Sequence, residues 1–173
     1  MGNILVISPT TRRFLVFLSA CGLAASTLAY IKSFSEDSID HSMRLALPLL
    51  IGVLALEIPI HILESSSSSH RRFYWKEIVR GMPRWVVPSS YLLVLAVIVH
   101  GVLFFLQGGS GVPTLHDGQY ILNGHGRILK VLTQEEYLTL RRAELRMLAS
   151  LMMCWYYMPM MYWWFRRNAQ RVD

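Results

Sequence analysis

Apolar residues in this chain are gathered into long runs, and the longest stretch free of helix breakers begins at Thr133. From Thr133 to Phe165 the first half is charged, the second is apolar and aromatic, and no Gly or Pro occurs before Pro159. Thr133 and Glu136 have the spacing of a capping box, in which each side chain accepts a hydrogen bond from a free amide at the helix start. The pattern predicts one helix over 133–165, about 50 Å long. Since bilayer hydrocarbon is roughly 30 Å thick, part of this helix would stand outside a membrane.

Three further runs are long enough to cross a bilayer, at 14–31, 45–63 and 85–106, and the apolar end of the long helix adds 148–165. The four runs are apolar on all sides, whereas a helix of a soluble bundle has a polar back. The hydrophobic fraction, 53%, agrees with this. The sequence therefore predicts an all-α integral membrane protein, with residues 1–173 forming a single four-span membrane domain.

Lys and Arg are distributed unequally between the two predicted sides of the membrane. They are more frequent in the N-terminal tail, the loop after the second span and the C-terminal tail than on the opposite side. Because cytoplasmic loops carry the excess of Lys and Arg, both termini are predicted to be cytoplasmic. Residues 107–146 then form an extracytoplasmic loop together with a protruding helix base.

A β-hairpin is predicted at 119–131 within this loop. Aliphatic flanks surround Asn123-Gly124-His125-Gly126, which is a turn signal. A two-residue Asn-Gly turn would pair Leu122 with His125. A four-residue loop would pair Leu122 with Arg127, Ile121 with Ile128 and Tyr120 with Leu129, and it is preferred because the partners are better matched.

The hairpin and the base of the long helix are expected to form one unit. A lone hairpin is marginally stable in water, so we expect it to dock on Tyr137, Leu138 and Leu145 of the helix base. Docking would leave four basic residues exposed as partner-binding candidates, namely Arg127, Lys130, Arg141 and Arg142. Such a surface suits an acidic protein partner. The alternative is that these arginines meet lipid headgroups.

Polar residues inside the predicted spans are the candidates for intramembrane chemistry. Glu57 lies in the second span with His61 one turn further on, and His100 lies in the third. An intramembrane carboxylate is costly and suggests function, for example in proton handling. The alternative is that Glu57 is protonated or hydrogen-bonded within the structure. His61 and His100 are predicted at different depths, which disfavours one shared metal or haem site.

Other motifs add little chemistry. Walker, H-E-x-x-H and C-x-x-C motifs are absent, and no catalytic residue, cofactor or metal is assigned. For His116, Asp117 and His125 in the outer loop, simple solvation is expected instead of metal binding.

The net charge is +6, and the basic residues flank the apolar spans. This placement indicates a role in membrane topology and contact with anionic lipid, and not nucleic-acid binding. Small residues of the first span predict close helix packing: Cys21, Gly22, Ala25, Ser26 and Ala29. The Met and aromatic residues of 148–165 are predicted to pack against the other spans.

In size, span count and layout of the termini, the chain resembles the four-span immunity proteins that protect bacterial inner membranes against pore-forming toxins. The resemblance is one of architecture and transfers no residue roles. It implies a small non-enzymatic inner-membrane protein that binds another membrane or periplasmic protein, as an immunity protein or an accessory subunit. The alternatives are a transport or proton-handling component that uses Glu57 and, less favoured, a membrane redox or hydrolytic enzyme.

Overall fold

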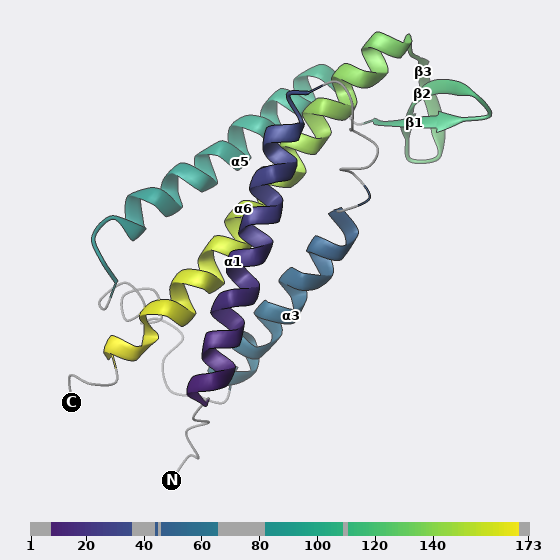
Figure 1. The fold of residues 1–173 in the computed structure, drawn as a ribbon. Coiled ribbons are helices and arrows are strands. Elements are labelled where there is room, and N and C mark those ends of the chain that lie inside the picture. Colours follow the sequence, from purple (N-terminus) through teal and green to yellow (C-terminus); the bar gives the residue numbers. More distant parts are fainter. Residues whose placement is uncertain (1–7, 36–43, 45, 66–81, 109–110, 170–173) are drawn as a thin grey trace.

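The computed structural model describes residues 8–35, 44, 46–65, 82–108 and 111–169. These residues form four long helices and one small sheet (Figure 1). The helices are α1 (Pro9–Lys32), α3 (Ala46–Ser65), α5 (Val86–Gly108) and α6 (Gln134–Ala169). They alternate in direction, so that α1 begins and α6 ends at the same end of the bundle. The sheet lies at the opposite end, beside the start of α6.

The long helix α6 is the central element of the fold. It packs against α1, α3 and α5, and its first turns contact the sheet. The predicted single helix is confirmed, although it continues to Ala169 and is about 54 Å long for its 36 residues. Pro159 does not end it. Its side chain is fully buried, so Pro159 belongs to the packed interior of the bundle.

Helix α1 presents a narrow stripe of mostly small buried residues. The buried positions follow each other at spacings of four and three and therefore share one face: Leu15, Ser19, Gly22, Ser26 and Ala29. The Ser19 and Ser26 hydroxyls donate to the carbonyls one turn back, each at 2.8 Å, so their burial leaves no donor unpaired. Close packing at Gly22, Ser26 and Ala29 is as predicted. Cys21, in contrast, is exposed.

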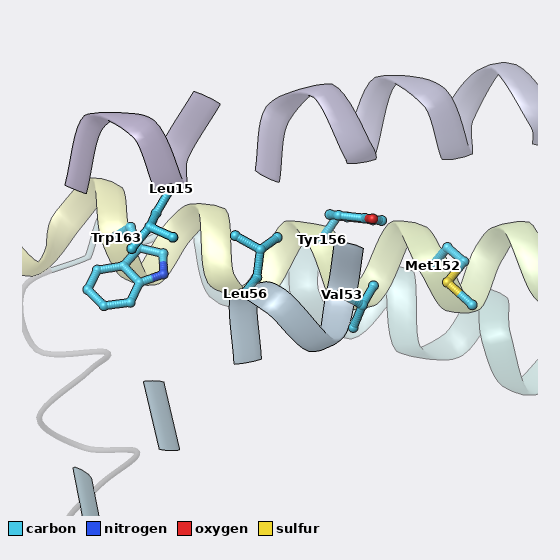
Figure 2. Close-up of a cluster of buried hydrophobic side chains, with 6 residues drawn as sticks. All are labelled: Leu15, Val53, Leu56, Met152, Tyr156 and Trp163. Carbon is cyan, nitrogen blue, oxygen red and sulfur yellow. The ribbon is translucent and has the colours of Figure 1, made fainter. Parts of the chain in front are cut away.

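Tyr156 of α6 joins three helices. Its ring occupies the space where a Cβ on Gly22 of α1 would stand, and its hydroxyl stands where a Cβ on Gly52 of α3 would be. The hydroxyl donates to the carbonyl of Leu49 at 2.6 Å. Around it lies a buried cluster from all three helices, drawn in Figure 2: Leu15, Val53, Leu56, Met152, Tyr156 and Trp163. Small residues on α1 and α3 thus create the socket for one large residue on α6.

Helix α5 packs on the other side of α6. Val86 forms a second buried cluster with Tyr157 and Met161 of α6. The hydroxyls of Ser89 and Tyr157 are hydrogen-bonded across this contact. Together with the cluster around Tyr156, this confirms that the Met and aromatic half of the long helix packs against the other helices.

Two of the helices in the described ranges, α1 and α5, are long and apolar enough to cross a membrane. The described apolar part of α3, Ala46–Ile58, is shorter. The apolar half of α6 is rich in Tyr and Trp, which combine an apolar ring with a polar group and so lower its hydropathy. The four predicted helices are all present, and length and apolarity qualify two of them as spans.

The sheet is larger than the predicted hairpin. It has three antiparallel strands in the order β1 (Val112–His116), β2 (Gln119–Gly124) and β3 (Arg127–Val131). The strand β1 was not predicted. The sequence does contain a signal for it, since the Asp117-Gly118 pair follows this strand. Asp-Gly favours the two-residue hairpin turns in which both residues have positive φ. Both do so here, with φ of 47° and 76°.

The predicted register of β2 and β3 is wrong. Gly124 pairs with Arg127, so the loop is the two-residue His125-Gly126, whose φ values of 51° and 81° fit a type I′ turn. Further along, Ile121 pairs with Val131, and the register shifts between Leu122 and Asn123. The shift leaves an extra residue in β3, as a bulge does. A register chosen by pairing aliphatic residues across the strands cannot reveal this bulge.

We expect Gly22→Ala to destabilise the bundle by about 1–3 kcal/mol, because the new methyl group would overlap the Tyr156 ring. That ring is buried and anchored through its hydroxyl, so it cannot move aside freely. The measurement is unfolding of the purified full chain in detergent, followed by circular dichroism.

Gly101→Ala on α5 is the matched control. A Cβ at Gly101 meets no heavy atom within 4 Å, and Ala favours a helix over Gly by about 0.5–1 kcal/mol. Equal stability of the two variants would contradict the close packing of α1 on Tyr156.

Candidate partner-binding surface

The base of α6 is fixed to β3 by a capping box. The Thr133 amide donates to the Glu136 carboxylate at 2.8 Å, and the Glu136 amide donates to the Thr133 hydroxyl at 3.2 Å. This confirms the predicted cap. The Lys130 ammonium of β3 donates to the same carboxylate at 2.6 Å. One side chain, Glu136, therefore holds both the start of the helix and the end of the sheet.

The inner face of the sheet packs on this helix base. A buried cluster joins Leu132, Tyr137 and Leu140, with Tyr120 and Leu138 packed against it. The Tyr120 and Tyr137 rings are 4.7 Å apart between centroids. Docking of the hairpin on Tyr137 and Leu138 is therefore confirmed. Leu145 is buried but lies outside this cluster.

The outer face of the sheet carries exposed apolar side chains among polar ones, since Thr114 and Asn123 share it with Val112 and Ile128. Paired residues of neighbouring strands point to the same face, so Val112 and Ile128 flank Asn123, and Val131 lies beside Ile121. Ile121 is 3% exposed, whereas Val112 is 46%, Ile128 61% and Val131 61% exposed. The Asn123 side-chain oxygen is buried among them without a hydrogen-bond partner. We call Val112, Ile121, Ile128 and Val131 the outer patch.

The basic candidates do not form the single exposed surface that the sequence suggested. Arg127 is exposed at the turn next to the outer patch, but Lys130 is paired with Glu136. Arg141 is half-buried, and its guanidinium donates to Glu144 at 2.8 Å and to the Tyr137 hydroxyl at 3.2 Å. Arg142 is also half-buried. Packing of the helix base against its surroundings removes these two arginines from the open surface.

Glu57 and His100 are the two polar candidates within the helices whose side chains the structure describes. Glu57 is half-buried on α3, and the His61 side chain lies outside the described residues. His100 of α5 bonds to Tyr30 of α1, with 3.2 Å between Nε2 and the hydroxyl. Its Nδ1 is 2.8 Å from the Ala96 carbonyl, so in the neutral ring Nδ1 carries the proton and Nε2 accepts from Tyr30. This interhelical bond was missed, because nothing in the sequence aligns Tyr30 with His100.

The three loop residues that could ligate a metal lie in and beside the turns. His116 and Asp117 are neighbours with 3.4 Å between their side chains, and both are largely exposed. His125 occupies the turn after β2. Within the described residues, no group of three or more His, Cys, Asp or Glu is arranged to hold a metal ion.

Acidification should loosen the junction at Glu136. The hydrogen bond from Lys130, followed by that from the Thr133 amide, lowers the pKa of the Glu136 carboxyl below its ordinary 4.5. A lowered pKa means that this junction contributes fully above pH 4.5 and is lost as pH falls through the lowered value. We expect the Thr133 amide resonance in the detergent-solubilised chain to titrate with a midpoint below 4.5.

Two variants separate this carboxylate from its neighbour. Glu136→Gln should abolish the titration of the Thr133 amide, and Glu135→Gln, in the same helical turn, should preserve it. A midpoint at or above 4.5, or an unchanged titration in Glu136→Gln, would refute the role given to this carboxylate.

Comparison with known proteins assigns no family to this arrangement. No protein-family model matches the chain, and no curated protein or solved structure matches it either.

Proposed function

We propose that this chain is a small, non-enzymatic integral membrane protein that works by binding another protein through the outer patch. The observation that carries the proposal is the exposure of Val112, Ile128 and Val131 around the buried Ile121. Exposed apolar side chains that gather on one face of a sheet commonly mark an interaction site. This surface is also firmly supported, since the inner face of the same sheet is docked on α6.

Charge suggests the chemistry of the partner. Arg127 stands exposed at the turn beside the outer patch, while Lys130 is already neutralised by Glu136. A partner with an apolar centre and an acidic rim near Arg127 fits these features, since complementary charges favour encounter and correct orientation. The partner would be a membrane or periplasmic protein. The role proposed is that of an immunity protein or accessory subunit, and its support is the resemblance in size and layout to the four-span immunity proteins.

We further propose that all four helices cross a bacterial inner membrane, with both termini cytoplasmic and the sheet outside. The apolar exposure of α5 supports insertion, because lipid can cover side chains that no other helix covers. These exposed residues are Tyr91, Leu92, Leu95, Ile98, Val102 and Phe105. For α3 and α6, support comes from their packing beside the two apolar helices. The excess of Lys and Arg near the termini sets the orientation.

A transport or proton-handling role for Glu57 is the competing proposal. Its support is the presence of one half-buried carboxylate on α3. The proposal includes no series of further ionisable groups along which a proton would move. The partner-binding role is preferred because several residues on one rigid sheet support it.

The orientation predicts opposite labelling of two positions. Gln119→Cys in the β1–β2 region and Thr10→Cys at the start of α1 are both at exposed sites. In a background with Cys21 and Cys154 replaced by Ala, an impermeant maleimide should label Gln119→Cys in intact cells. Thr10→Cys should label only after permeabilisation. Labelling of both positions in intact cells would contradict an up-and-down four-span topology, and the reversed pattern would invert it.

The outer patch predicts site-specific crosslinking. A photo-crosslinking amino acid at position 128 or 131 should give the same discrete protein adduct in cells. Leu115 is the control, because it is 56% exposed but pairs with Tyr120 on the inner side of the sheet. Ile128→Thr combined with a crosslinker at 131 should weaken the adduct, since Thr keeps the β-propensity and loses apolar area. Lipid adducts alone, or equal adducts from 115, would overturn the proposal.

A further inference from the structure

Arg146 stands where the charged half of α6 meets its apolar half. The residues that follow it, from Met147 onward, are predominantly apolar and aromatic. Its guanidinium carbon lies 4.8 Å above the ring of Phe34, which comes two residues after α1 ends at Lys32. Helix α1 is long and apolar enough to cross a membrane. In the membrane placement proposed above, its end lies at the level of the polar headgroups, and Arg146 lies at the same level.

The guanidinium is held in place without being neutralised. Unlike Arg141, which is bound to Glu144, Arg146 forms no hydrogen bond or ion pair with the part of the chain that the structure describes. Its Nε atom is buried without a partner. Nη1 and Nη2 also have no partner there and are not buried, so the terminal fork of the half-buried side chain remains open.

Aromatic neighbours restrict how this fork can turn. The Phe34 ring is packed edge-on against Tyr30, with 5.5 Å between centroids. Tyr30 is in turn fixed to His100 of α5. A cation stacked on a ring gains energy and loses conformational freedom before any ligand arrives. The arrangement presents two parallel N–H donors at a defined position and leaves them without an acceptor.

We propose that Arg146 binds the phosphate group of an anionic lipid headgroup at the sheet-side boundary of the membrane. Phosphate oxygens match the planar guanidinium fork in a bidentate manner, which a point charge such as Lys cannot reproduce. Lys32, exposed in the last turn of α1, adds positive charge at the same end of that helix. The inference rests on the proposed membrane placement and is independent of partner binding at the outer patch. A free phosphate ion has the same chemistry, so the experiment separates the two sources.

The test measures ligand-induced thermal stabilisation of the purified full chain in neutral detergent. Three probes are added separately: short-chain phosphatidylglycerol, diacylglycerol with the same acyl chains, and inorganic phosphate. A ligand that binds the folded state raises Tm. We expect phosphatidylglycerol to raise Tm and diacylglycerol to raise it much less. Stabilisation by inorganic phosphate at comparable concentration would identify a general phosphate site, and its absence would identify the lipid as the source.

Variants assign the effect to Arg146. Arg146→Gln should raise the phosphatidylglycerol concentration needed for half-maximal stabilisation by about tenfold or more. For Arg146→Lys, this concentration should lie between those of the unmodified chain and Arg146→Gln. Arg127→Gln, at an exposed arginine on the sheet, should not change it. Each variant is compared with its own Tm without lipid, so a lower intrinsic stability does not mimic lost binding. An unchanged response in Arg146→Gln, or equal stabilisation by diacylglycerol, would overturn the proposal.

Discussion

The insertion of Tyr156 between two glycines is the contact on which the helical bundle depends. Gly22 and Gly52 leave room for one aromatic ring and its hydroxyl, which reaches the Leu49 carbonyl. In the proposed membrane placement, the helices would gain little from the hydrophobic effect, so close packing and interhelical hydrogen bonds would hold them together. Tyr156 supplies both at once. The serines of the α1 stripe fit the same requirement, because they are small and satisfy their hydroxyls within their own helix.

The continuity of α6 links this packing to the surface at the other end. The helix that carries Tyr156 also carries Tyr137 and Glu136, without a break in between. A continuous helix transmits position well, so the orientation of the sheet follows from the packing of the bundle. The Glu136 junction then fixes β3 to the first turn. The outer patch is consequently presented on a rigid support, which would lower the entropic cost of the partner binding proposed above.

Sequence periodicity and capping chemistry predicted the helices well and the sheet incompletely. Long apolar runs and the Thr133–Glu136 pair are local signals, and the structure agrees with them. The register of β2 and β3 was missed first at the turn, where the loop is His125-Gly126, and again at a bulge further along, which no local pattern encodes. The strand β1 had a usable signal in Asp117-Gly118. The contact of Tyr30 with His100 joins residues 70 positions apart, so only the tertiary structure reveals it.

Four of the basic residues at the sheet-side end divide into two groups, and the division separates structural roles from proposed functional ones. Lys130 and Arg141 each have a carboxylate within 3 Å, so they stabilise the junction and the helix base and offer little charge to a ligand. Arg127 and Arg146 have no such partner within the described chain. They also differ from each other, since Arg127 is exposed at the start of β3 and Arg146 is stacked on Phe34. The exposed cation suits the rim of the proposed protein interface, and the pre-positioned one suits the proposed lipid phosphate. The role of each basic side chain in this region thus depends more on the groups that surround it in space than on its position in the sequence.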